Sequence, residues 1–235
     1  MSTIVENIAK VRDRIREAAQ AAQRPVSTVG LLAVSKTKPA SAIREAYAAG
    51  VCDFGENYLQ EALAKQAELA DLPLVWHFIG PIQSNKCKAI AEHFAWVHSV
   101  DRLKVARRLS ELRPERLPPL NVCLQVNISG EASKSGCAPE EAGELAAAIA
   151  ALPGPKLRGL MAIPEPCDDP EQQRATFARL RSLAEALNAS RQLALDTLSM
   201  GMSHDLEAAI AEGATWVRIG TALFGARDYP AAPTA

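Results

Sequence analysis

The sequence predicts an α/β fold: a single (β/α)8 barrel over residues 1–235, with one extra helix at its N-terminus. Three observations predict it. Eight short apolar, β-rich runs alternate with helical patterns, the 235 residues suit one barrel, and no Pro/Gly/Ser-rich linker divides the chain. Because each crossover helix returns the chain in the same direction, we expect the strands to pair in parallel. An open doubly wound sheet is the alternative topology.

The first element is a helix. Thr3 and Glu6 have the spacing of a capping box, and Pro25 follows where the helical pattern ends. The apolar side chains that recur at helical spacing are Ile4, Ile8, Val11 and Ile15.

Strands and helices then alternate. The expected strands cover residues 31–35, 53–56, 76–80, 96–100, 122–128, 157–163, 197–200 and 217–220. The expected helices lie near residues 40–49, 57–69, 84–93, 101–112, 139–151, 170–188 and 203–212. The longest of them begins with Asp169 as a cap and Pro170 in the first turn.

Composition excludes several classes of protein. The 26 basic and 27 acidic residues give a net charge of −1, without the basic excess of a nucleic-acid binder. The five cysteines contain no C-x-x-C pair, which favours reduced thiols and a cytoplasmic protein over a zinc or disulfide framework. The first residues lack the pattern of a signal peptide, and no apolar run approaches the ~18 residues of a membrane span.

Small and polar residues follow nearly every predicted strand. In a parallel barrel the C-terminal strand ends meet at one mouth, where ligand sites are built. Lys36 follows the apolar run 31–34, so packed strand would hold its stem while its amine points into the mouth. Partial desolvation lowers the pKa of a lysine and frees the amine as a nucleophile for imine formation. A surface lysine is the alternative.

The last two predicted loops suit an anion. Gly220 and Thr221 come directly after the final strand, and Ser199 and Ser203 lie in the loop before it. Glycine permits close backbone approach, and these loops often bind phosphate in barrels. An ordinary glycine turn with a serine cap is the alternative. Arg218 should point inward, and a buried arginine needs an acceptor, so we expect a ligand atom or a carboxylate beside it.

Together these segments resemble the pyridoxal phosphate homeostasis protein family, and the resemblance covers nearly the whole chain. It is also carried by residues 97–101, 125–129, 133–136 and 158–164. The motifs that include the candidate residues are Ser35-Lys36-Thr37-Lys38-Pro39, Phe54-Gly55-Glu56-Asn57-Tyr58, His77-Phe78-Ile79-Gly80, Leu198-Ser199-Met200-Gly201-Met202-Ser203 and Val217-Arg218-Ile219-Gly220-Thr221.

The resemblance implies a fold type III vitamin B6 barrel, related to the N-terminal domain of alanine racemase, that binds pyridoxal 5′-phosphate (PLP). Lys36 matches the lysine that forms the Schiff base, and Arg218 matches the residue that faces the pyridine nitrogen. Gly220 and Thr221 match the phosphate cradle. The remaining residues that the resemblance places at the cofactor are Ser199, Ser203, Asn57 and Met200.

The resemblance further implies a cofactor carrier with PLP homeostasis as its role and without robust catalysis. An arginine at the pyridine nitrogen disfavours its protonation and weakens the ring as an electron sink. The sequence ends ten residues after Gly225, so we expect no C-terminal β-domain of the racemase type and a monomer. Apo PLP-dependent enzymes are the expected recipients. A weak PLP-dependent amino-acid racemase or lyase is the alternative.

Two further residues leave alternatives open. Lys134 is a candidate for a second, transient imine, and a surface loop lysine is the other interpretation because serine and glycine flank it. His77 is either a pocket residue or a histidine hydrogen-bonded in the core.

Overall fold

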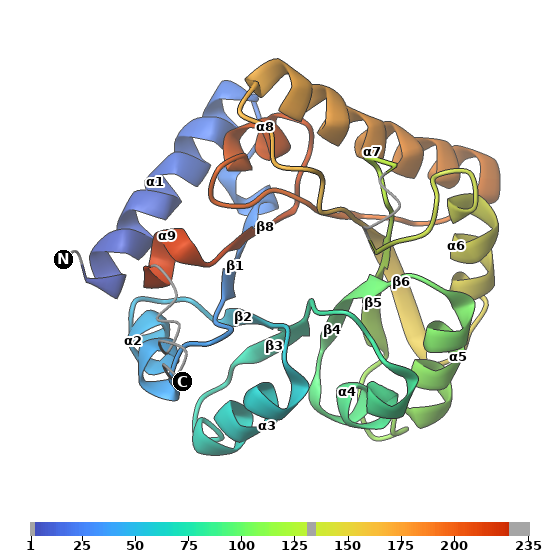
Figure 1. Ribbon diagram of the computed structural model, residues 1–235, viewed down its shortest axis with the longest axis horizontal. Helices are drawn as coiled ribbons and strands as arrows, with labels where there is room; N and C mark the ends of the chain where they lie inside the picture. The colour runs from blue at the N-terminus through green and yellow to red at the C-terminus, as the bar shows by residue number, and fades with distance from the viewer. Residues whose placement is uncertain (1–2, 131–134, 226–235) are drawn as a thin grey trace, which may run out of the picture.

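The computed structural model describes residues 3–130 and 135–225, which form a closed barrel of parallel strands (Figure 1). Spatial order follows chain order, and β1 (Gly30–Val34) pairs with β8 (Trp216–Ile219) to close the ring. Closure confirms the barrel and excludes the open sheet. The other strands are β2 (Asp53–Glu56), β3 (Val75–Phe78), β4 (Trp96–Val100), β5 (Leu120–Gln125), β6 (Pro155–Met161) and β7 (Thr197–Ser199).

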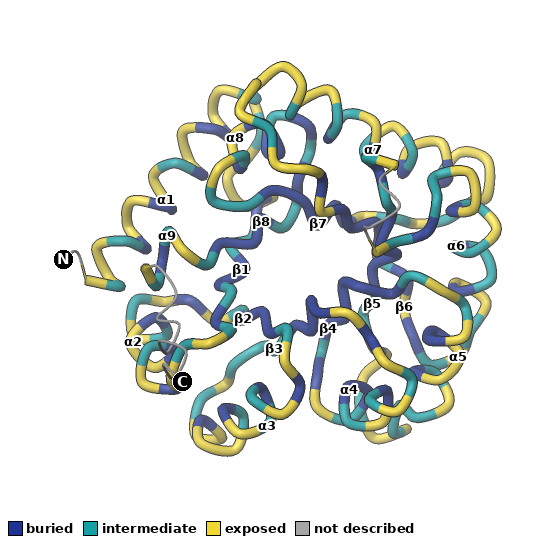
Figure 2. The backbone as a smooth tube through the Cα atoms, in the orientation of Figure 1, coloured by how far each residue is buried: buried dark blue, intermediate teal, exposed yellow. Residues whose placement is uncertain are grey.

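Helices surround the strands, with their exposed residues facing outward (Figure 2). No helix within the described residues is long and apolar enough to cross a membrane. The helices are α1 (Ile4–Ala21), α2 (Ala40–Ala48), α3 (Leu59–Glu68), α4 (Cys87–His93), α5 (Leu103–Leu112), α6 (Ala142–Ala150), α7 (Pro170–Arg191), α8 (Leu206–Ala211) and α9 (Thr221–Phe224), with short 3₁₀ turns at Val26–Thr28 and Ser84–Lys86.

The predicted boundaries differ from the observed ones at both strand and helix ends. The run predicted as a strand over 122–128 overlaps β5, which begins and ends earlier, at Leu120–Gln125. Val126 and Ile128 are nevertheless 1% and 3% exposed. Both side chains belong to the main hydrophobic core, so apolar character continues beyond the ladder of hydrogen bonds.

Both predicted helix caps are present. The Thr3 hydroxyl accepts from the Glu6 backbone N–H, and the Glu6 carboxylate accepts from the Thr3 N–H, which completes the capping box. The Asp169 carboxylate accepts from the N–H of Glu171, and Pro170 occupies the first helical position. Each cap satisfies donors that the first helical turn leaves without partners.

Helix α1 covers the side of the barrel where the first and last strands meet. The element after β8 is only the single turn α9, which is too short to cover that side. Helix α1 packs against α2, α8 and α9 there (Figure 1), and it buries Ile8, Val11 and Ile15. The extra N-terminal helix thus stands in the place of an eighth outer helix.

The barrel interior is unusually polar. Branched apolar side chains fill most such barrels, whereas here His77, His98 and Ser199 are completely buried and Arg218 is 4% exposed. The His77 ring stacks on Trp96 with 5.6 Å between ring centroids. Its ring nitrogens lie within hydrogen-bond distance of His98 and Asp53, which confirms His77 as a histidine of the core.

Candidate functional site

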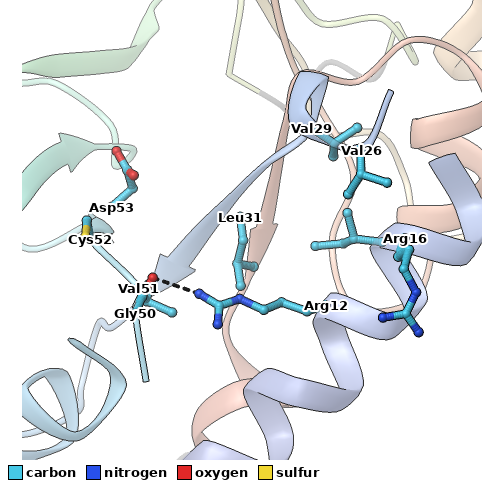
Figure 3. Close-up of a pocket in the computed structure, with 10 residues that line it drawn as sticks. Arg12, Arg16, Val26, Val29, Leu31, Gly50, Val51, Cys52 and Asp53 are labelled. Carbon is cyan, nitrogen blue, oxygen red and sulfur yellow. Dashed lines mark hydrogen bonds between the residues drawn. The ribbon is translucent and has the colours of Figure 1, made fainter. Parts of the chain in front are cut away.

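A pocket of about 200 Å³ opens at the C-terminal ends of the strands. It brings together six of the predicted site residues, namely Lys36, Asn57, Ser203, Arg218, Gly220 and Thr221. The residues that complete its lining are Val34, Ile79, Ile163, Met202 and His204. A larger cleft, of about 460 Å³, lies at the opposite end between α1 and the strand starts (Figure 3). Ligand sites of parallel barrels lie at the C-terminal ends, so the mouth pocket is the candidate site.

Lys36 lies in a tight turn just beyond β1. The Ser35 N–H still donates to the Gly55 carbonyl of the neighbouring strand, at 3.0 Å. The Lys38 N–H then donates back to the Ser35 carbonyl, also at 3.0 Å, and closes the turn. Thr37 takes a φ of 64°, in the left-handed region that a β-branched residue rarely occupies. Such a conformation persists only where the surroundings hold it.

A buried ion-pair cluster holds this turn, and we call it the Lys65 clamp; it consists of Lys65, Glu56 and Glu61. The Lys65 ammonium donates to the Ser35 carbonyl at 2.7 Å and to Glu56 Oε1 at 2.8 Å. It also pairs with Glu61 Oε1, which accepts from the Thr37 N–H at 2.6 Å. The clamp therefore grips the residues on both sides of Lys36 and accounts for the strained φ of Thr37.

The electrostatics of the Lys65 clamp are those of a buried site. The side chain of Lys65 is 7% exposed and that of Glu56 is fully buried. Burial raises the pKa of the Glu56 carboxyl, while the nearby Lys65 ammonium and the Ser35 hydroxyl favour its charged form. The Lys65 clamp was not predicted from the sequence. The only available signal was the i,i+4 spacing of Glu61 and Lys65 on one helix, a spacing typical of ordinary surface pairs.

Asn57 presents an unsatisfied acceptor at the pocket. Its side-chain oxygen is buried and has no hydrogen-bond partner within the described part of the chain. A buried amide oxygen without a partner is costly, which indicates a ligand donor. Gly80 fixes the residue from behind, since a Cβ at Gly80 would lie 2.3 Å from the Asn57 carbonyl oxygen.

Arg218 enters the pocket from inside the barrel, as predicted, but its acceptors differ from the expected ones. One guanidinium nitrogen donates to the Ser199 hydroxyl and the other to the Ala162 carbonyl, both at 2.8 Å. Asp205 acts only through its charge, which favours the protonated form. Burial lowers the pKa of Arg218 to about 10, so the guanidinium is charged at neutral pH. Both acceptors are neutral, so the positive charge of Arg218 remains available to a ligand.

Two predicted site residues lie behind the pocket surface. Ser199 is completely buried, and its oxygen contacts Arg218 and His98. Met200 is also completely buried, with its side chain in the hydrophobic core and its N–H donating to the Trp216 carbonyl. The structure thus places Ser199 as a support for Arg218 and Met200 as packing under the loop.

Helix α1 supports both loops of the predicted anion cradle. Arg14 donates to the Ser203 carbonyl at 3.0 Å and forms an ion pair with Glu207 of α8. Asn7 donates to the Leu223 carbonyl at 2.9 Å, at the end of α9. The cradle residues after β7 and β8 are therefore fixed to one outer helix.

The two buried histidines make the fold sensitive to acid. Burial lowers the pKa of His77, against the opposing effect of Asp53, and holds the pKa of His98 well below its ordinary value. Below about pH 6.5 the unfolded chain therefore binds protons that the folded chain does not, so stability falls as pH falls. Each such histidine contributes up to about 1.4 kcal/mol per pH unit.

We expect the free energy of unfolding to fall between about pH 7.5 and about pH 5 because of these rings. His98→Asn should show a shallower fall than the wild type, by up to the contribution of one histidine. Urea unfolding of the cofactor-free protein at both pH values measures it. His93, which is exposed on α4, provides the control variant His93→Asn. Equal slopes for His98→Asn and the wild type would contradict the prediction.

Similar proteins identify the family of this chain. Residues 7–228 match the family described as alanine racemase, N-terminal domain. The pyridoxal phosphate homeostasis protein of Pseudomonas aeruginosa is 76% identical over 231 residues, which cover 98% of this chain and 99% of that protein. The chain belongs to the pyridoxal phosphate homeostasis protein family. The relative of the same name in Escherichia coli K12 is 55% identical, with 97% of this chain and 99% of that protein covered.

Solved structures agree with this family and with the fold. PipY of Synechococcus elongatus with PLP bound has a TM-score of 0.83 and 44% identity, covering 95% of this chain and 100% of that one. Alanine racemase of Corynebacterium glutamicum has a TM-score of 0.66 and 19% identity, covering 94% of this chain and 62% of that one, which shows the fold alone. Lys134, the candidate for a second imine in this family member, lies outside the described residues.

Proposed function

We propose that this chain binds PLP through a Schiff base on Lys36 and carries and buffers the cofactor, without robust catalysis of its own. One observation carries the proposal: an amine, a buried unpaired amide oxygen and a buried guanidinium line the same pocket. The names of the relatives and the PLP in the PipY structure support it.

The residues present fit PLP in chemistry. The cofactor supplies an aldehyde carbon that an amine can bind reversibly, and Lys36 supplies the amine. The unpaired oxygen of Asn57 would accept from a donor of the ligand, and the Arg218 guanidinium would lie toward the pyridine nitrogen. Ser203, Gly220 and Thr221 would hold the phosphate, while Ser199 keeps its hydrogen bond to Arg218.

What the pocket residues do with protons supports the carrier role. A fixed positive charge at Arg218 keeps the ring nitrogen unprotonated and limits carbanion chemistry. Racemisation also needs acid–base groups on two faces of the substrate. Within the described residues, the lining offers Lys36 and, at the exposed rim, His204. Residual racemase or lyase activity would therefore depend on His204.

Sodium borohydride reduction of the PLP-loaded protein, followed by peptide mapping, tests the site. We expect one pyridoxyl adduct, on Lys36. Two assays then test the role. Incubation with an apo PLP-dependent enzyme should transfer the cofactor, and chiral chromatography after incubation with alanine or serine should detect no steady turnover. An adduct elsewhere would overturn the site, and sustained turnover that His204→Asn abolishes would favour the enzyme over the carrier.

Loosening the support by α1 should weaken cofactor binding. Asn7→Ala removes the hydrogen bond to the Leu223 carbonyl, and Asn7 is not one of the residues that line the pocket. We expect the PLP dissociation constant to rise roughly threefold to tenfold, because one net hydrogen bond contributes about 1 kcal/mol. Fluorescence titration with PLP measures the change. The control is Arg16→Ala, which lies on the same helix and pairs only with Asp13 in the described structure. Equal affinities in both variants would show that the Asn7 contact with Leu223 does not support cofactor binding.

We further propose that the protein acts as a monomer in the cytoplasm and that its recipients are apo PLP-dependent enzymes. The five cysteines are unpaired, as expected of thiols in a reducing compartment. Light scattering at several protein concentrations tests the monomer.

A further inference from the structure

A series of four hydrogen bonds crosses the barrel and ends at the cofactor pocket. Asp53 Oδ1 lies 3.0 Å from His77 Nε2, and His77 Nδ1 lies 2.9 Å from His98 Nε2. His98 Nδ1 lies 2.7 Å from Ser199 Oγ, which accepts from Arg218 Nη1 at 2.8 Å. We call these five residues the barrel relay. The three residues between its ends are completely buried.

The two ends of the barrel relay determine where each proton lies. Arginine can only donate, and an ionised carboxylate can only accept. Arg218 donates to Ser199, so the Ser199 hydrogen is free to point at His98 Nδ1. His98 then carries its proton on Nε2 and donates to His77 Nδ1. His77 likewise carries its proton on Nε2 and donates to Asp53. Every donor meets an acceptor with both rings neutral.

The opposite order leaves two contacts unsatisfied. If His98 Nδ1 donated to Ser199, the serine oxygen would receive two donors and its own hydrogen would have no acceptor among the relay residues. A neutral His77 would then place a lone pair against the Asp53 carboxylate. A buried polar contact of this kind is costly. Burial lowers the pKa values of both histidines, which is consistent with neutral rings.

The far end of the relay is fixed at the foot of the barrel. Asp53 is the first residue of β2, and its side chain is 28% exposed beside the larger cleft. In Figure 3 its carboxylate points away from Arg12, which instead donates to the carbonyls of Ala49 and Gly50. The Asp53 carboxylate is therefore available to His77, and stacking on Trp96 holds the His77 ring in place.

We propose that His98, oriented by His77 and Asp53, is a positioning residue for the cofactor pocket. His98 accepts a hydrogen bond from the Ser199 hydroxyl and so orients a lone pair of the serine oxygen toward Arg218. This contact sets the plane in which the guanidinium meets the ligand. The proposal rests on the proposed function, since the ligand is PLP. It explains why a barrel interior contains two adjacent histidines where apolar side chains are usual.

Nitrogen NMR of the cofactor-free wild type tests the proton order without any variant in the relay. His93→Asn and His204→Asn, both at exposed positions, assign two of the four histidines by difference. We expect His77 and His98 to be neutral at neutral pH, each protonated on Nε2, with coupling across the His98–His77 hydrogen bond. A proton on Nδ1 of His98, or rapid exchange between tautomers, would overturn the proposal.

A matched pair of variants tests the effect on the cofactor. His98→Asn keeps an acceptor where Nδ1 lies, whereas His98→Leu removes it and leaves the Ser199 hydroxyl hydrogen without an acceptor among the relay residues. We expect the PLP dissociation constant to rise roughly tenfold in His98→Leu and less than about threefold in His98→Asn. The pH midpoint of the bound cofactor's absorbance should shift only in His98→Leu. His93→Leu controls for the loss of a histidine.

The two proposals fail in different ways. If borohydride gives no adduct on Lys36 in the wild type, the proposed function fails whatever the tautomers are. If the adduct forms but His98→Leu matches His93→Leu in affinity and in pH midpoint, only the positioning role fails. If His98→Leu does not fold, the tautomers of the wild type and the affinity of Ser199→Ala decide, because Ser199→Ala removes the same oxygen from Arg218. Wild-type affinity in Ser199→Ala would then end the proposal.

Discussion

Lys36→Ala should lose the pyridoxyl adduct at residue 36 and bind PLP roughly 100-fold more weakly, a change of about 2.7 kcal/mol. The amine of Lys36 gives the covalent bond, and the remaining pocket residues can hold the cofactor only by hydrogen bonds and charge. Fluorescence titration gives the dissociation constant, and peptide mapping after borohydride reduction locates any residual adduct.

Lys38→Ala is the matched control for Lys36→Ala, since Lys38 lies two residues away in the same turn. It should retain the adduct on Lys36 and nearly all of the affinity. If Lys36→Ala bound PLP with wild-type affinity, and if the adduct lay on another lysine in both Lys36→Ala and the wild type, Lys36 would not be the residue that forms the Schiff base. An adduct on Lys134 that appears only in Lys36→Ala would support the second imine.

Lys65→Met should lower the free energy of unfolding by about 3–5 kcal/mol, because it leaves the buried Glu56 carboxylate without its cation. The change would also release Ser35 and Thr37, so PLP affinity should fall even under conditions where the protein stays folded. Urea unfolding and PLP titration measure the two effects.

Lys88→Met makes the same side-chain change at an exposed position of α4 and should alter neither quantity appreciably. Glu61→Gln keeps an oxygen for the Thr37 N–H while removing the charge. Its stability and its PLP affinity should lie between those of Lys65→Met and Lys88→Met. If Lys65→Met were as stable as Lys88→Met, the Lys65 clamp would have no role in holding the turn.

The fold was predictable because the barrel repeats one simple pattern. Eight apolar runs separated by helical patterns leave few alternatives, and the caps at Thr3 and Asp169 mark two helix starts by local chemistry alone. The strand ends were less predictable. Val126 and Ile128 are buried for reasons of tertiary packing, so their apolar character says nothing of where the ladder ends.

The site residues that lie at a strand end or just after it were predictable from the sequence. Lys36 and Arg218 lie where the pattern places them, at one mouth. Their supports were not predictable. The Lys65 clamp joins residues of β2 and α3 to the turn after β1, and Ser199 meets His98 across 101 positions of sequence. Contacts of that separation depend on strand register, which no local pattern specifies.

The hydrogen bond between Asn7 and Leu223 joins residues 216 positions apart. The N-terminal residues leave the ribosome first, so α1 emerges long before α8 and α9, the helices against which it packs. The barrel can close, and the loops after β7 and β8 can take their final shape, only once the chain through α9 has been synthesised. Nascent chains stalled short of α9 should therefore bind no PLP, which would confine cofactor loading to chains that already include α9.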